Sequence, residues 1–327
     1  MLLRPRMSCD QKELVTFLSD MYSVEQQAIA QMASAPALAG DRQFSDDLRR
    51  HYAETEQHLR LVRERLDAHD KPVSMIKTAI MRAGGKAFLL FALSQPETPG
   101  KLAAHTYSYE AMEWAGYEIL RRLAQLADDP QTLAVAFAIR NQERAMMERL
   151  ERDFDAAEAI SHRDVCLEVM KNHLRSHLRE AHALEVQSAN LIKNARKIAN
   201  DPIFAEVCGQ NLQKSCEHAR VIEVLLNLLG TKPSKLEDSG LSFNAWNWNL
   251  FFKFHSDRSV KVAAFTYGHE HLKAAAYELL SRAARRTRDI ETGEFCAQLV
   301  KEQRAMADHV AATFDSVVQT TLRETES

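Results

Sequence analysis

The sequence predicts an all-α protein built from two tandem four-helix bundles. Apolar residues recur at intervals of three and four along most of the 327 residues, which is the period of an amphipathic helix. Only 10 glycines and 8 prolines interrupt this pattern, so long helices with short connections are favoured. The second half repeats the first at a shift of 160 residues, and self-similarity of this kind indicates a duplicated unit.

Helix start and stop signals divide each half into four elements. Asp129-Pro130 and Asp201-Pro202 each read as an N-cap residue followed by proline at the first helical position, and Gly230 reads as a helix stop. The expected helices of the first half are 10–34, 42–70, 99–128 and 130–158. Those of the second half are 164–199, 202–229, 258–287 and 290–322.

The lengths of the connections predict the topology. In each half a long segment joins the second and third helices, whereas the other two connections are short. This is the connectivity of a ferritin-like bundle with one crossover. We therefore expect two ferritin-like domains, residues 1–160 and 161–327, packed as an internal pseudo-dimer, with further homodimerisation left open.

Composition limits the partners and the compartment. The net charge of −3 gives no reason to expect nucleic acid or an anionic membrane as a partner. The five cysteines are scattered without a Cys-x-x-Cys pair, which favours a reducing, cytoplasmic setting. No apolar run is long enough for a transmembrane segment, and no signal peptide is expected.

The two crossovers differ in character. Residues 76–93 end in a short apolar run, whereas residues 243–254 are rich in tryptophan and phenylalanine. The aromatic residues of the second crossover are Phe243, Trp246, Trp248, Phe251, Phe252 and Phe254. They could cover a bundle face or join the two halves, or they could bind a partner or a membrane surface.

Carboxylates interrupt the apolar stripes that should face the core. Glu25 lies on a stripe with Leu18, Met21 and Ala28, and a lone ionised glutamate in a core must be paired, metal-bound or protonated. The other helices of the first half supply partners on the same side. These candidate ligands are His51, Glu54 and His58 on the second helix, Glu110 with the flanking Glu113 on the third, and Glu143 on the fourth.

Four glutamates and two histidines are the donor set of a dimetal carboxylate site in a helical bundle. Carboxylate oxygens with imidazole suit iron or manganese, which would react with dioxygen or peroxide as an oxidase or peroxidase does. The spacing departs from the usual Glu-x-x-His pattern, because Gln57 follows Glu54 and Met146 follows Glu143 at the third position. The alternative is a metal-free polar network with arginine or histidine as the counter-ion.

The second half retains only part of this set. Glu185, His218 and Glu270 persist as candidate ligands at the positions of Glu25, His58 and Glu110. Four other positions change: His51 to Asn211, Glu54 to Lys214, Glu113 to Lys273 and Glu143 to Gln303. Incoming lysines suggest an ammonium group in place of a metal ion, so a second half without metal is equally expected.

Each half resembles the YciE/YciF-like family of ferritin-like bacterial stress proteins. The residues that carry the resemblance are Leu18–Gln27, His51–Leu59, Tyr107–Tyr117 and the pair Gln142-Glu143. The resemblance covers nearly the whole chain twice. It implies a bundle that dimerises, a di-iron centre and a link to stress responses. Its metal positions match Glu25, Glu54, His58, Glu110 and Glu143 of this chain.

The leading hypothesis is thus a ferritin-like protein that binds iron or manganese in its first half. Two rivals stand beside it. One is a metal-free helical scaffold with neutralised inner carboxylates, and the other is an interaction protein that uses the aromatic crossover at 243–254.

Overall fold

The computed structural model describes residues 7–73, 98–163, 165–233 and 259–326, and all regular elements in these ranges are helices. The first bundle consists of α1 (Cys9–Met32), α2 (Arg42–Ala68), α4 (Thr98–Leu126) and α5 (Pro130–Ser161), with a short 3₁₀ helix, Ala35–Leu38, between α1 and α2. The second bundle consists of α6 (Leu167–Ile198), α7 (Pro202–Leu228), α10 (Ser259–Arg286) and α11 (Ile290–Ala311), followed by α12 (Phe314–Glu326).

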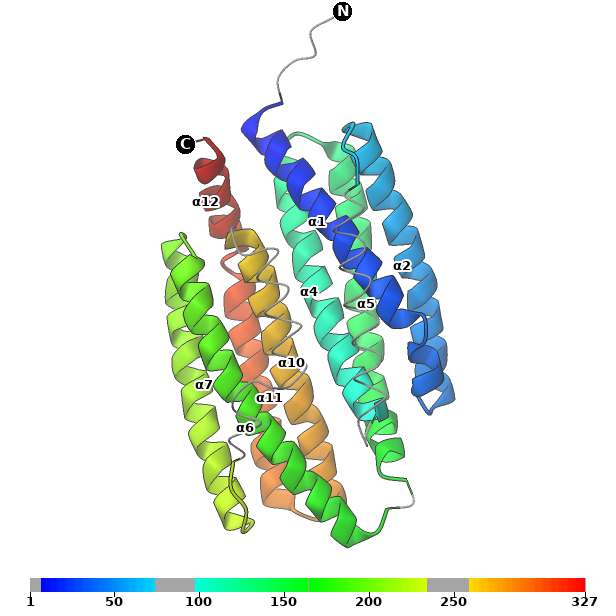
Figure 1. Ribbon diagram of the computed structural model, residues 1–327, viewed down its shortest axis with the longest axis vertical. Coiled ribbons are helices and arrows are strands. Elements are labelled where there is room, and N and C mark those ends of the chain that lie inside the picture. The colour runs from blue at the N-terminus through cyan, green and yellow to red at the C-terminus, as the bar shows by residue number, and fades with distance from the viewer. Residues whose placement is uncertain (1–6, 74–97, 164, 234–258, 327) are drawn as a thin grey trace, which may run out of the picture.

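The two bundles lie side by side, as Figure 1 shows. In each, consecutive helices pair as α1 with α2, α4 with α5, α6 with α7 and α10 with α11. The long crossover separates the second and third helices of each bundle. The expected all-α fold of two tandem bundles with ferritin-like connectivity is therefore confirmed.

Capping residues begin and end these helices as expected. The Asp129 and Asp201 carboxylates accept hydrogen bonds from the backbone N–H groups of Thr132 and Phe204, at 2.9 and 2.7 Å. Gly230 follows α7 with φ +70°, a conformation that glycine adopts without the steric cost that a Cβ would add. The domain division near residue 160 stays a prediction; α5 ends at Ser161 and α6 begins at Leu167.

The prediction of one continuous helix over residues 290–322 is wrong. It breaks after Ala311, and a new helix begins at Phe314. The hydroxyl of Thr313 donates to the carbonyl of Val310 at 2.7 Å and so competes with the helical hydrogen bonds. Beyond the break, α12 packs against α1 and α4 of the first bundle, where Arg122 and Asp315 form an ion pair at 2.5 Å.

Helices α4 and α10 form most of the contact between the bundles, and equivalent residues meet there. Ser108 and Gly268, which correspond under the 160-residue shift, touch directly: the serine hydroxyl donates to the glycine carbonyl at 2.9 Å. A Cβ on Gly268 would lie 2.7 Å from the Cβ of Met112, so glycine permits this close approach. The halves therefore meet through the same surface of each, which is the arrangement of an internal pseudo-dimer.

Helix α4 is covered on almost every side, because α1, α5 and α10 all pack against it. Between Leu102 and Leu120 every residue except His105 and Trp114 is buried. None of the described helices is long and apolar enough to cross a membrane. The segments 76–93 and 243–254, on which the partner and membrane-surface hypothesis depends, lie outside the described residues.

Candidate metal centre

Six ionisable side chains converge in the middle of the first bundle, and each is 0% exposed. They come from all four helices: Glu25 on α1, His51 and His58 on α2, Glu110 and Glu113 on α4, and Glu143 on α5. The seven-residue spacing of the two histidines keeps both on the inner face of α2, two turns apart. The six side chains form two overlapping groups of potential metal donors.

The first group contains His51, Glu110, Glu113 and Glu143, whose donor atoms lie within 4.8 Å of one another. The Nε2 atom of His51 is 2.6 Å from Oε2 of Glu110 and 3.7 Å from Oε2 of Glu143. Glu113 forms neither a hydrogen bond nor an ion pair with any described residue.

The second group contains Glu25, His58 and Glu143. The Nδ1 atom of His58 is 2.9 Å from Oε1 of Glu143 and 3.6 Å from Oε1 of Glu25. The hydroxyl of Tyr117 donates a short hydrogen bond to Glu25. Glu143 belongs to both groups, so its two oxygens can serve two ions at once.

Each histidine is held from outside by a hydrogen-bond partner on its other nitrogen. The Nε2 atom of His58 donates to the side-chain carbonyl of Gln142 at 2.7 Å. The Nδ1 atom of His51 lies 3.3 Å from Glu54, which Arg149 in turn binds at 2.6 Å. An acceptor on the outer nitrogen orients the ring and leaves the inner nitrogen facing the glutamates, which is the arrangement of metal-bound histidines.

Burial raises the pKa of three of the four glutamates. It raises the pKa of Glu110 to about 8 and that of Glu25 to about 7, although the histidines partly offset the effect. Burial and the other carboxylates raise the pKa of Glu113 well above its usual range. Burial also disfavours ionised Glu143, but His58 and His51 outweigh it and lower the pKa of this carboxyl to about 2.

For the two histidines, burial lowers the pKa and the neighbouring carboxylates raise it. Burial disfavours a charged ring, yet Glu25 and Glu143 raise the pKa of His58 to about 9. The neighbouring carboxylates raise the pKa of His51 well above its usual range in the same way. Two histidines cannot balance four carboxylates, so burial favours the protonated form of the remaining glutamates.

The hydrogen-bond inventory shows the same excess of acceptors. Seven carboxylate oxygens of the four glutamates are buried and accept no hydrogen bond of good geometry, although histidine nitrogens lie near some of them. Buried polar atoms are normally satisfied. Hard carboxylate oxygens with two imidazole nitrogens are a donor set that fits iron or manganese.

The structure brings together all but one of the residues expected at this site. Glu54 lies outside both groups, 20% exposed, because it is turned about 60° from the line of His51 and His58 around α2. Glu113, expected only at the flank, lies inside the first group. The signal for Glu113 is the run of apolar residues around it, from Ala111 to Tyr117, which indicates that more than one face of this helix is buried.

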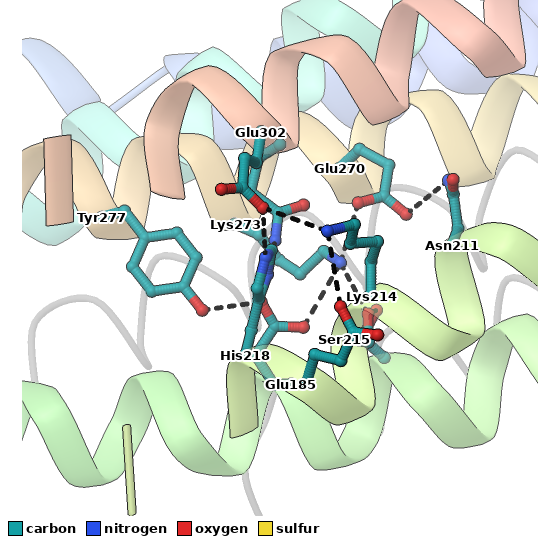
Figure 2. A network of polar contacts seen from close by, with 12 residues as sticks. Glu185, Asn211, Lys214, Ser215, His218, Glu270, Lys273, Tyr277 and Glu302 are labelled. Atoms are coloured by element: carbon teal, nitrogen blue, oxygen red, sulfur yellow. Dashed lines mark hydrogen bonds and ion pairs between the residues drawn. The ribbon is translucent and has the colours of Figure 1, made fainter. Parts of the chain in front are cut away.

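In the second bundle an ammonium group occupies the equivalent place (Figure 2). Lys273, which replaces Glu113, is 0% exposed. Its Nζ atom lies 2.8 Å from Glu270 and 3.4 Å from Glu185, and it donates to Ser215 at 2.9 Å. The neighbouring carboxylates raise the pKa of Lys273 despite the cost of burial, so it remains charged.

Amides satisfy the remaining oxygens of this second network. The amide of Asn211 donates to Glu270 at 3.1 Å, and that of Gln303 donates to Glu185 at 2.8 Å. The Tyr277 hydroxyl also donates to Glu185, at 2.6 Å, as Tyr117 does to Glu25. Among the described residues of this bundle, no three donors gather closely enough to hold a metal ion.

Lys214, the other lysine that replaces a glutamate of the first bundle, does not reach the core. Lys214 is about half exposed and pairs with Glu217 and Glu302 at 3.4 and 3.6 Å. Glu302 in turn lies 3.1 Å from Nε2 of His218. Glu185, His218 and Glu270 thus come together as expected, but around Lys273.

No solved structure matches the chain. A family model described as a domain of unknown function, DUF892, matches residues 10–160 and again residues 169–323. The two matches cover nearly the whole chain and coincide with the two bundles, so this protein is a tandem duplication that belongs to the DUF892 family.

Proposed function

We propose that the first bundle binds two ions of iron or manganese and that the second bundle binds none. The observation that carries the proposal is the pair of buried donor groups that share Glu143. His51, Glu110 and Glu113 would hold one ion, and Glu25 and His58 the other, with Glu143 between them. Inward glutamates and histidines from four helices are how bundles of this connectivity hold two metals.

The protein supplies the surroundings of such a centre. Gln142 and the Glu54–Arg149 pair orient the two histidines, and Tyr117 orients Glu25. The full burial of all six donors excludes bulk water, which strengthens their interaction with a cation. When bound, iron or manganese supplies electron-transfer chemistry with dioxygen or peroxide. Together with the resemblance to bacterial stress proteins, this supports a role in the response to oxidants.

Metal analysis of the full chain tests the proposal. Protein purified from cells supplied with iron and manganese is expected to contain about two metal ions per chain. Replacing Glu110 and Glu143 by glutamine should abolish binding, because Glu143 supplies a carboxylate to both groups and Glu110 supplies one to the first. Replacing Glu270 by glutamine in the second bundle is the matched control and should leave the metal content unchanged.

The rival is a metal-free scaffold in which His51 and His58 alone neutralise the carboxylates. It predicts no stoichiometric metal under any loading condition. It also predicts that iron or manganese has no effect on the thermal stability of the wild-type chain, whereas a bound metal stabilises the folded state.

A further inference from the structure

A second set of acidic residues lies on the α2–α5 face of the first bundle, between the candidate centre and the end where α2 begins. It comprises Asp47 and Glu54 on α2 and Asp153 on α5, with Arg149 among them. The spacings of seven along α2 and four along α5 keep these residues on one face of each helix. We call these four residues the access strip.

The strip is continuous with the candidate centre. Arg149 lies 4.0 Å from Asp47 and 2.6 Å from Glu54, and so joins the two carboxylates. Glu54 is 3.3 Å from His51, whose other nitrogen faces Glu110 at 2.6 Å. The strip therefore leads by contacts from a partly exposed carboxylate to a fully buried one.

Asp153 is the carboxylate of the strip that forms no ion pair with a described arginine. It is only 4% exposed, and its Oδ2 atom has no hydrogen-bond partner. Burial and the nearby Asp47 raise its pKa to about 6, although Arg149 and Arg152 act in the opposite direction. Arg149 contacts Asp47 and Glu54 but leaves the buried Oδ2 atom of Asp153 without a hydrogen bond, and such an acidic group attracts a cation.

The second bundle provides an internal comparison, because it has the same fold. The positions of Asp47, Glu54 and Asp153 are occupied there by Val207, Lys214 and Thr313. Thr313 lies in the break between α11 and α12, and its hydroxyl donates to a backbone carbonyl at 2.7 Å, whereas Asp153 lies inside α5 and its Oδ2 atom has no hydrogen-bond partner among the described residues. The acidic strip is thus present in the bundle with the donor groups and absent from the bundle in which a lysine fills the equivalent place.

We propose that the access strip is the route by which a divalent cation enters the first bundle, with Asp47, Glu54 and Asp153 attracting the ion toward His51 and Glu110. The Arg149 side chain lies across this route and must move aside as the ion replaces its charge. This inference rests on the proposed metal centre, since a route needs a destination.

The test measures the rate of uptake separately from the amount bound. Metal-free full-length protein is mixed with Co²⁺, whose visible absorption changes when carboxylate and histidine donors bind it. Replacing Asp47 and Asp153 together by asparagine should slow uptake about tenfold at low ionic strength, because the attraction of the strip for cations is lost. The final amount of cobalt should equal that of wild type, and the difference in rate should shrink as salt is added.

The matched control removes the same charge from the same two helices away from the strip. Asp46 and Glu148 are both more than half exposed, and their replacement by asparagine and glutamine should leave the rate unchanged. If the double asparagine variant does not fold, Asp47→Asn and Asp153→Asn are measured as single variants, and each should slow uptake relative to the surface control.

The possible results separate the route from the centre. A wild-type chain that takes up no cobalt overturns the proposed function, and the route with it. A strip variant that takes up cobalt as fast as the surface control overturns the route alone. A variant that binds less cobalt at equilibrium also overturns it, since Asp47 and Asp153 would then be ligands of the bound ion.

Discussion

Loss of the buried ammonium group of the second bundle should destabilise the protein strongly. Lys273→Met removes the charge and retains much of the side-chain volume. The ammonium contacts two carboxylates, at 2.8 Å in Glu270 and 3.4 Å in Glu185, in a site without solvent exposure. Removing one partner of a buried ion pair leaves an uncompensated charge and typically costs about 3–5 kcal/mol. We expect a loss of this size in the free energy of unfolding at neutral pH.

The cost should depend on pH in a defined direction. In the wild-type chain burial disfavours ionised Glu185, but Lys273 and His218 lower its pKa from 4.5 to about 2. A lowered pKa stabilises the fold above pH 4.5, and this stabilisation is lost as the pH falls toward 2. The variant lacks the lysine that contributes most to the lowering. Its disadvantage relative to wild type should therefore shrink below pH 4.5.

Urea denaturation followed by circular dichroism measures these differences, with Lys214→Met as the matched control. Lys214 is about half exposed, so its loss should cost less than about 1 kcal/mol. A second variant, Lys273→Met with Glu270→Gln, should recover part of the stability because it removes one of the stranded charges. Lys273→Met stability within about 1 kcal/mol of wild type at neutral pH would refute the view that the ammonium replaces a cation in this core.

Three further predictions concern the first bundle and the interface. Glu54→Gln should weaken metal binding about 10- to 100-fold, because Glu54 orients His51. A competition titration measures the affinity, and the metal content at saturation should not fall. An unchanged affinity would contradict this role of Glu54. Metal affinity should fall as the pH drops from about 9 to 6, because protons compete first for His58, with a pKa of about 9, and then for Glu110 and Glu25, with pKa values of about 8 and 7. A flat titration from about pH 9 to 6 would argue against their role as ligands. Gly268→Val should lower the free energy of unfolding by about 1–3 kcal/mol, because the added side chain clashes with α4. Ser108→Ala, which removes only a hydrogen bond, should cost about 1 kcal/mol. Equal effects of the two variants in calorimetry would contradict the close packing of α4 and α10.

The fold was predictable because its determinants are local. Helix periodicity, N-cap residues before proline and the glycine after α7 depend on neighbours in sequence, and the structure places helix ends within a few residues of those expected. The exception is the break between α11 and α12. It depends on one threonine hydroxyl and on the packing of α12 against the first bundle, and the periodicity of the sequence continues through both.

The candidate site was predictable in part for the same reason. A glutamate on an apolar stripe, as at Glu25, Glu110 and Glu143, is visible in a helical projection. The projection placed Glu54 with the inward histidines and Glu113 only at the flank of its stripe, because it cannot show how much of a helix is covered. Glu54 lies at the edge of α2, which has a solvent-facing side, whereas Glu113 lies on α4, which is enclosed by its own bundle and by α10.

The sequence by itself determined the two bundles, their connectivity and the unequal sets of ionisable residues in the two halves. Only the tertiary structure decided which of those residues meet. It joined the donors of the first bundle into two groups through Glu143, and it placed Lys273 rather than Lys214 among the carboxylates of the second. The physical reason is that burial, which sets both the cost of a charge and its need for a partner, depends on the packing of helices distant in the chain.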